Sequence, residues 1–464
     1  MGALYLCRKA GGKGWFDMTQ HKEIQKDFFR YVSLNILGMI GLSCYILADT
    51  YFVANGLGAN GLAALNLAIP VYNFINGLGL MIGMGAATRY SILKGTASRR
   101  ETDGIFSQAV IFALGIALIL MLIGLFFARP LGTLLGADET VIDMTAPYLQ
   151  VLLLFSPMFL MNNLILCFVR NDGAPRLAMA GMLIGSLSNI VLDYVFIFPC
   201  GMGMFGAALA TGTAPVVSLA IQSSHFFRKR NHFRFRLCRP RFRALWDISS
   251  LGAPSLITEV SSGVVMIFFN MVILSLSGNI GVAAYGVVAN LALVVLSIFT
   301  GISQGIQPLV SRSYGAQDAV AVKKVYRYAI TTALALAAGV YVVLFLFAPQ
   351  AVSLFNGENN QQLAAIAEPG IRLYFIGFLF AGFNVVTAVT FSSVDRPRQS
   401  FLLSILRGFV LIIPLIFLLT ALLGMTGVWL AFPVCEFLTA GVALVFWLRY
   451  GRNLLQGAEE LTHE

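Results

Sequence analysis

Four acidic side chains lie deep within long apolar stretches of this sequence: Asp49, Asp193, Glu259 and Glu436. On membrane-insertion scales, a carboxylate at the centre of a helix costs about 2.5–3.5 kcal/mol. Acids retained at such positions are typical of sites that bind a proton, a small cation or a polar partner. Asp193 lies one helical turn after Asn189, so a helix places both side chains on one face. These residues therefore predict proton or cation chemistry inside a membrane.

Three segments of the first half are expected to bring oxygen-bearing side chains together near the outer side of the membrane. Asp49 lies towards the end of the first apolar stretch, Asn189 and Asp193 lie in the fifth, and Thr211 lies early in the sixth. Their oxygens suit a hard cation, and two neighbouring acids also suit a proton. Two plainer interpretations stay open. Asp49 would then be a helix-end residue at the interface, and Asn189 and Asp193 would hydrogen-bond between helices.

Apolar stretches long enough to span a bilayer recur along the whole chain. Hydrophobic residues make up 58% of it, charged residues only 11%, and the mean hydropathy is +0.82. This composition is far from that of soluble proteins. We therefore predict an all-α polytopic membrane protein with twelve transmembrane helices. The predicted helices cover residues 33–53, 62–88, 107–128, 145–169, 177–198, 205–227, 249–276, 282–308, 327–348, 369–392, 401–423 and 427–448.

The second half of the sequence repeats small and turn-forming residues of the first half in the same order. This repetition predicts an internal duplication, with two lobes of six helices each. Because each lobe has an even number of spans, both enter the membrane in the same sense and are related by a pseudo-two-fold axis along the membrane normal. The repeated positions include Gly58 and Gly278, Gly61 and Gly281, Gly85 and Gly305, Gly95 and Gly315, and the pairs Pro175-Arg176 and Pro397-Arg398.

The basic residues predict the orientation of the chain. It carries 31 Lys and Arg against 21 Asp and Glu, a net charge of +10. With both termini cytoplasmic, only Arg129 and Arg372 fall on the outer side, in agreement with the positive-inside rule. The surplus therefore indicates contact with the lipid bilayer and no nucleic-acid partner. The expected segments are a cytoplasmic N-terminal segment 1–30, a first lobe 31–227, a basic cytoplasmic linker 228–247, a second lobe 248–450 and a cytoplasmic tail 451–464.

The sequence has no motif typical of an enzyme or an ATP-driven pump. It lacks a P-loop, a nucleophile elbow and an HExxH segment. Its six cysteines are scattered, and none of its four histidines lies well inside a predicted span. We therefore expect neither catalysis nor a cofactor, and we expect an ion gradient to supply the energy.

Two segments carry a resemblance to a known family. ADTYFVANGLGANGLAALNLAIP from Ala48 and GISQGIQPLVSRSYGA from Gly301 resemble the signature regions of the multidrug and toxic compound extrusion (MATE) family. The chain is most similar to the bacterial multidrug exporters with a Gly-x-x-Gln-Gly-x-Gln-Pro segment. The resemblance implies a monomeric antiporter of the bacterial inner membrane, in which two lobes alternate to export drug-like compounds in exchange for H+ or Na+. The alternative within the same superfamily is a flippase for lipid-linked saccharides, which would be expected to need extra helices or an Arg-rich cavity.

The resemblance also implies a cation site in the first lobe. Asp49, Asn189, Asp193 and Thr211 match the family's site residues, and Asn163 of the fourth span is added to them. The coupling ion would be H+, or Na+ bound by the first four.

A substrate path is expected between the lobes. Some family members have an acidic pair in the second lobe, but the tenth span has no carboxylate here, so Glu259 is assigned to the path or to helix pairing. Arg407 is its expected partner, and Glu436 is expected to be structural. Aromatic and methionine side chains suit lipophilic cations, although the same residues also serve in packing. The residues assigned to the path are Tyr45, Tyr72, Met81, Met84, Glu259, Gln304, Gln307 and Arg407.

Overall fold

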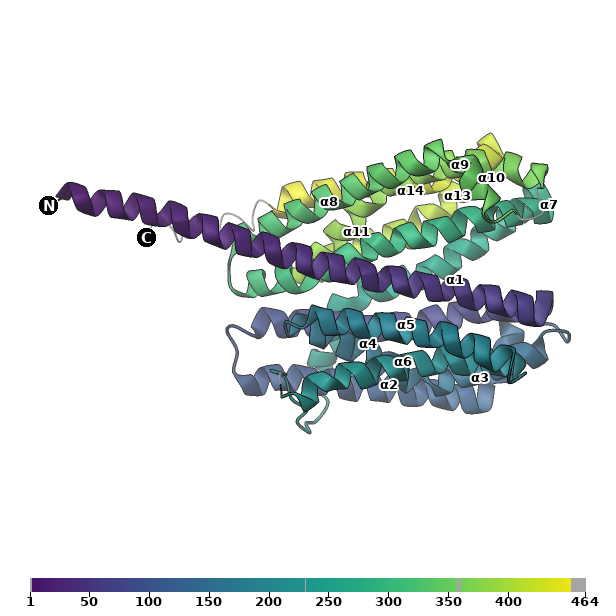
Figure 1. Ribbon diagram of the computed structural model, residues 1–464, viewed down its shortest axis with the longest axis horizontal. Helices are drawn as coiled ribbons and strands as arrows, with labels where there is room; N and C mark the ends of the chain where they lie inside the picture. Colours follow the sequence, from purple (N-terminus) through teal and green to yellow (C-terminus); the bar gives the residue numbers. More distant parts are fainter. Residues whose placement is uncertain (1, 230, 357–359, 452–464) are drawn as a thin grey trace.

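The computed structural model describes residues 2–229, 231–356 and 360–451, so most of the expected tail lies outside the described residues. Every regular element in these ranges is a helix. Figure 1 shows two bundles side by side, with α2 to α6 in one and α8 to α14 in the other, and α1 running along their junction.

The two longest helices each contain two membrane spans. α1 (Gly2–Leu93) is interrupted at Gly58, with φ of 67°, and α7 (Phe242–Gly315) is interrupted at Gly278, with φ of 60°. Positive φ favours glycine because it has no Cβ. The hydroxyls of Tyr45 and Tyr72 hydrogen-bond across the first break, so the spans on either side run antiparallel. Two of the repeated glycines of the sequence thus form the tight turns within α1 and α7.

The predicted twelve spans in two lobes are confirmed. Nine helices of the described residues are long and apolar enough to cross a membrane, or ten when α3 and α4, which meet at 47°, count as one. Because α1 and α7 hold two spans each, the total is twelve. The remaining helices of the first lobe are α2 (Arg99–Leu134), α3 (Ile142–Leu154), α4 (Ser156–Asn171), α5 (Pro175–Ile197) and α6 (Gly203–Phe227). Those of the second lobe are α8 (Ala319–Leu346), α9 (Ala348–Ser353), α10 (Gln361–Tyr374), η1 (Phe375–Gly377), α11 (Phe378–Ser393), α12 (Pro397–Ile405), η2 (Leu406–Val410), α13 (Ile412–Leu423), α14 (Met425–Phe446) and η3 (Trp447–Gly451).

Several helices extend beyond the apolar stretches that predict them, and α2 shows why. The Ser98 hydroxyl accepts a hydrogen bond from the backbone of Glu101, while the Glu101 carboxylate accepts one from the backbone of Ser98. This capping box starts the helix at Arg99, eight residues before the predicted span at 107. α7 likewise begins at Phe242, inside the segment expected as linker.

The first helix belongs to both lobes. The core of the first lobe is built from α1 to α6, but Phe28, Tyr31 and Val32 near the start of the first span are buried in the core of the second lobe. The ring of Phe28 lies 5.6 Å from that of Tyr328 on α8. The helix that carries Asp49 is therefore anchored at its other end in the opposite lobe.

The lobes approach most closely through a reciprocal pair of glycines. A Cβ on Gly252 would lie 1.8 Å from the carbonyl oxygen of Met81, and one on Gly85 would lie 2.0 Å from the carbonyl oxygen of Ile248. Both contacts lie in the half of the bundle that contains the end of α1 and the start of α7. Backbone against backbone leaves no room for a side chain there, so these glycines allow the lobes to meet.

We predict that Gly252→Ala destabilises the contact between the lobes. The added methyl group meets a backbone carbonyl that cannot rotate away, and overpacking of this kind costs about 1–3 kcal/mol. The thermal unfolding temperature of the purified protein should fall. Gly286→Ala is the matched control, because it lies on the same helix with nothing within 4 Å of the added Cβ. Equal unfolding temperatures for the two variants would contradict this account of the contact.

Candidate functional site

The structure brings Asn189, Asp193 and Thr211 together between α5 and α6. All three are buried, and Asn189 and Asp193 are wholly inaccessible. With its amide oriented to suit its neighbours, Asn189 donates to Asp193 Oδ2 at 3.0 Å and accepts from the backbone N–H of Thr211 at 3.3 Å. Buried Asp49 of α1 is near enough to Asp193 for their negative charges to repel. The expected convergence of three segments is therefore present in the fold.

Three oxygens of this cluster lack a hydrogen-bond partner among the described residues. They are Oδ1 of Asp49, Oδ1 of Asp193 and Oγ1 of Thr211. Buried acceptors are paired in the great majority of proteins, so three unpaired oxygens in one cluster are unusual. The donor set is hard oxygen and suits a proton or Na+. In the part of the chain that the structure describes, no group of three His, Cys, Asp or Glu side chains forms a metal site.

A pair of tyrosines lies beside the carboxylates. Tyr45 precedes Asp49 by one helical turn, so both side chains lie on the same face of α1. Its hydroxyl hydrogen-bonds to that of Tyr72, whose ring packs edge-on to Phe159 at 5.8 Å. The tyrosine pair thus lies beside Asp49, the carboxylate of the first span.

Asn163 is placed in a second polar chain that crosses between the lobes. Its side-chain amide donates to Oδ1 of Asn76 at 2.8 Å, and Asn76 donates to Oε2 of Glu259 at 3.3 Å. The hydrogen bond of its side chain is therefore with this polar chain and not with Asn189 or Asp193. Asn76 was missed by the sequence analysis. The signal was its position as a polar amide in the second apolar span.

An unexpected buried cation joins the lobes at the Gly-x-x-Gln-Gly-x-Gln-Pro segment. Arg170, at the end of α4, is wholly buried, and no carboxylate of the described residues forms an ion pair with it. Its Nη1 donates to Oδ1 of Asn35 at 2.8 Å and to Oε1 of Gln304 at 2.7 Å. Its Nη2 contacts the sulfur of Met84 at 3.3 Å.

Gln307 makes the neighbouring contact between the lobes. Its Oε1 accepts from Asn171 at 2.9 Å, and its Nε2 donates to the hydroxyl of Thr88 at 2.8 Å. We call the contacts of Gln304 and Gln307 with the first lobe the interlobe latch. Met84 lies beside this latch, because it contacts Arg170, and Met81 contributes its backbone to the close glycine contact. These assigned path residues therefore lie where the lobes are closed together.

The prediction that Arg407 pairs with Glu259 is wrong. Arg407 pairs with Glu436, through Nε at 3.0 Å and Nη2 at 2.8 Å to Oε1, and not with Glu259. Asn384 donates to the other carboxylate oxygen, Oε2, at 2.7 Å. Arg407 lies in η2, a π-helical turn that interrupts the eleventh span. Glu436 is thus already paired and hydrogen-bonded.

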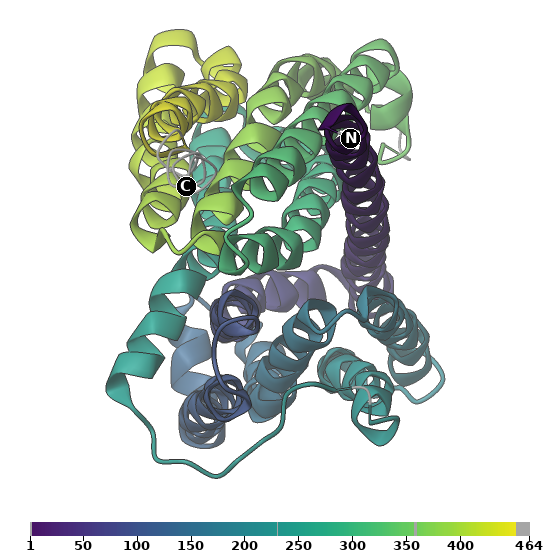
Figure 2. The same cartoon turned by 90° about the vertical axis from the view of Figure 1, so that its left-hand side faces the viewer.

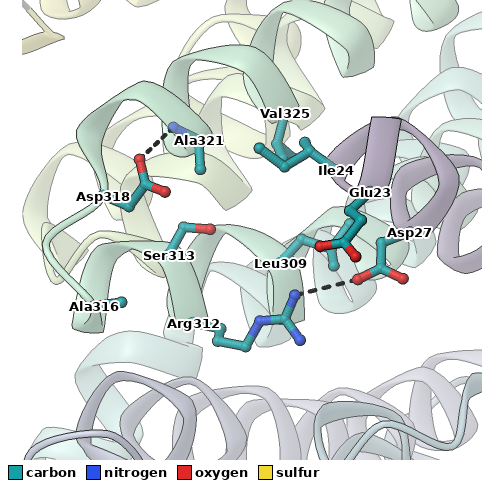
Figure 3. A pocket seen from close by; sticks show the side chains of 10 residues that line it. All are labelled: Glu23, Ile24, Asp27, Leu309, Arg312, Ser313, Ala316, Asp318, Ala321 and Val325. Atoms are coloured by element: carbon teal, nitrogen blue, oxygen red, sulfur yellow. Dashed lines mark hydrogen bonds and ion pairs between the residues drawn. The ribbon is translucent and has the colours of Figure 1, made fainter. Parts of the chain in front are cut away.

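A pocket of about 310 Å³ lies elsewhere, where the start of α1 meets α7 and α8. Figure 3 shows Arg312 in an ion pair with Asp27, at 3.3 Å, and Glu23 beside them. None of the residues assigned to the cation site or to the substrate path lines this pocket. It therefore carries no part of the candidate site.

Comparisons with known proteins agree with this architecture. The chain matches the MatE family model over residues 35–195 and 254–418, one match in each lobe. It is 27% identical over 429 residues to the multidrug export protein MepA of Staphylococcus saprophyticus, which covers 92% of this chain and 94% of the relative. MepA of Staphylococcus aureus strain MSSA476 is 26% identical over 417 residues, covering 88% of this chain and 90% of the relative.

Solved structures give the same result. One is described as the outward-facing conformation of a multidrug resistance MATE family transporter of the MOP superfamily. It superposes with a TM-score of 0.87 at 26% identity, covering 93% of this chain and 97% of that one. A MATE structure in the bent conformation superposes with a TM-score of 0.85 at 25% identity, covering 94% and 97%.

We predict that removing the interlobe latch exposes the buried end of α4. In a background with the other five cysteines changed to Ser, Cys167 is the probe, because it is wholly buried beside Arg170. In Gln304→Ala/Gln307→Ala each lost hydrogen bond costs about 0.5–1.5 kcal/mol, so maleimide should label Cys167 roughly tenfold faster.

Gln350→Ala/Gln361→Ala is the control for this experiment, since both side chains are exposed near α9 and α10. Its labelling rate should match that of the parent. Unchanged labelling in the latch variant would show that these glutamines do not hold the lobes together.

Proposed function

Because this chain belongs to the MATE family, we propose that it exports lipophilic, often cationic compounds in exchange for H+ or Na+. The observation that carries the ion coupling is the set of unpaired buried oxygens on Asp49, Asp193 and Thr211. A proton or Na+ held there satisfies groups that otherwise lose their hydration with no compensation. Release of the ion restores the repulsion between the two carboxylates.

The coupling acts through the equilibrium between two arrangements of the lobes. An ion shifts that equilibrium only if it binds one arrangement more tightly than the other. α1 supplies the connection, because it carries Asp49 and is also packed, through Phe28 and Val32, into the second lobe. A change in the packing of α1 around Asp49 thus alters the contact between the lobes.

We assign the latched half of the bundle to the cytoplasmic side of the bacterial inner membrane. The basic linker lies at that half, as the positive-inside rule expects. The closed latch and the glycine contact then describe an outward-facing arrangement, like that named for one related structure. In this arrangement the cytoplasmic route is sealed by Gln304, Gln307 and the buried Arg170.

The substrate is assigned to the space between the lobes, around the chain from Asn163 through Asn76 to Glu259. Glu259 supplies a negative charge for a cationic substrate, and Tyr45 and Tyr72 supply aromatic surface. Since Tyr45 lies one helical turn from Asp49 and hydrogen-bonds to Tyr72, drug and coupling ion occupy neighbouring sites.

We predict that Asp49→Asn and Asp193→Asn each abolish drug resistance in cells. An amide keeps the size of the side chain but removes the charge that binds the ion. Growth in the presence of a lipophilic cationic drug is the measurement, with immunoblotting of the membrane fraction to show that the protein is present. Asp143→Asn, in the exposed ion pair with Arg129, is the control and should retain resistance. Full resistance in both membrane-site variants would refute the assignment.

We also predict that efflux depends on an ion gradient and not on ATP. ΔpH and ΔNa+ are imposed separately on vesicles that contain the purified protein, and one of the two should drive efflux of a fluorescent cation. The gradient that drives efflux identifies the coupling ion. Efflux should stop when an ionophore collapses that gradient. Efflux that continues with neither gradient would exclude antiport.

A further inference from the structure

The linker between the lobes presents an unusual set of exposed side chains. From 228 to 243 it reads RKRNHFRFRLCRPRFR, half of which is Arg or Lys, with no acid. Large apolar side chains alternate with the basic ones. Phe235, Leu237 and Phe242 are 51%, 90% and 82% exposed, and Trp246 follows in the first turns of α7 at 65%. Figure 2 shows the segment running round the outside of the first lobe, on the end that faces the viewer.

The backbone of this linker is fixed by side chains of α2. The N–H of Arg234 donates to Oδ1 of Asp103 at 2.9 Å, and the N–H of Arg236 donates to the hydroxyl of Ser107 at 2.8 Å. Gln108 accepts from the N–H of Arg241 at 3.0 Å and donates to the carbonyl of Arg239 at 2.7 Å. The extended backbone is thus satisfied on the side facing the lobe, which leaves most of the side chains free to point away.

The buried side chain of Phe233 holds the start of the same segment in place. Phe233 is wholly buried, with its ring 4.7 Å from that of Phe106 and 5.1 Å from that of Phe168. Beside it, the backbone N–H of His232 donates to Asp172 at 2.8 Å, and Lys94 donates to the same carboxylate at 2.7 Å. The start of the linker is therefore held in a fixed position on the first lobe.

The carboxylate of Asp172, which holds the backbone of His232 in place, keeps its charge at neutral pH. Burial alone would raise the pKa of Asp172, but hydrogen bonds from His225, Lys94 and the backbone of His232 outweigh it and hold that pKa at about 2. A lowered pKa means that the contribution of this group is present above its ordinary value and is lost only as the pH falls towards 2. The contact with His232 therefore holds throughout the physiological range.

We propose that the segment from Arg234 to Trp246 is a docking surface for anionic phospholipid headgroups. Arginines at a membrane surface attract acidic lipids, and exposed Phe, Leu and Trp side chains insert at the boundary of headgroups and acyl chains. Both features are present on one fixed strand, at the end of the transmembrane bundle where the headgroup layer lies. The proposed orientation decides only which leaflet supplies the lipid.

The test compares lipid retention by two charge variants in the full-length protein. Arg239→Gln/Arg241→Gln/Arg243→Gln changes three exposed side chains and leaves the backbone contacts with Gln108 in place. Arg99→Gln/Arg100→Gln/Lys323→Gln is the control, because it removes the same charge from exposed positions at the same end of the bundle. Each protein is equilibrated with mixed micelles of phosphatidylglycerol and phosphatidylcholine, and retained lipid is quantified by mass spectrometry.

We expect the wild type and the control to retain phosphatidylglycerol in preference to phosphatidylcholine. The linker variant should lose this selectivity by roughly tenfold or more, because each basic residue in contact with anionic headgroups adds a several-fold factor, and the three control residues lie outside the proposed surface. Phe242→Ser/Trp246→Ser should lower retention of both lipids together. Equal selectivity in the linker variant and the control would overturn the proposal. It would favour an acidic protein as the partner of this surface. None of these outcomes depends on drug transport.

Discussion

A polar side chain inside an apolar bilayer segment must find its partners within the protein, and this constraint explains how the buried charged groups of the two lobes are placed. Arg170 has no acidic partner among the described residues, so its guanidinium is held by amide and sulfur acceptors drawn from both lobes. That solution ties the lobes together. Moving them apart would separate this buried cation from its Gln304 acceptor, and so the closed arrangement of this half of the bundle is stabilised by the cost of losing that hydrogen bond.

The two lobes satisfy the same constraint differently. In the second lobe, Glu436 receives hydrogen bonds from Arg407 on one oxygen and from Asn384 on the other. In the first lobe, Asp49 and Asp193 each keep an oxygen without a donor among the described residues. A fully paired acid has little to gain from an ion, whereas an unpaired one does. The duplicated scaffold thus carries a structural acid in one half and a responsive pair in the other.

Much of this could be predicted from the sequence, where the relevant interaction is local. Hydropathy gave the spans, the repeated Gly58 and Gly278 marked the turns, and the one-turn spacing of Asn189 and Asp193 placed two site residues on one face. Contacts between distant helices were beyond its reach. The pairing of Arg407 was predicted wrongly, and Arg170 and Asn76 were missed, because a partner on another helix leaves no spacing pattern in the chain.

The shared first helix has a consequence for how the protein is made. Phe28, Tyr31 and Val32 are synthesised before the second lobe, yet the core that buries them is formed by α7, α8 and later helices of that lobe. The start of this span therefore completes its packing only after those helices have been made. Until ribosomes have delivered the second half, this stretch of α1 faces lipid or the insertion machinery, and the first lobe cannot mature as an independent unit.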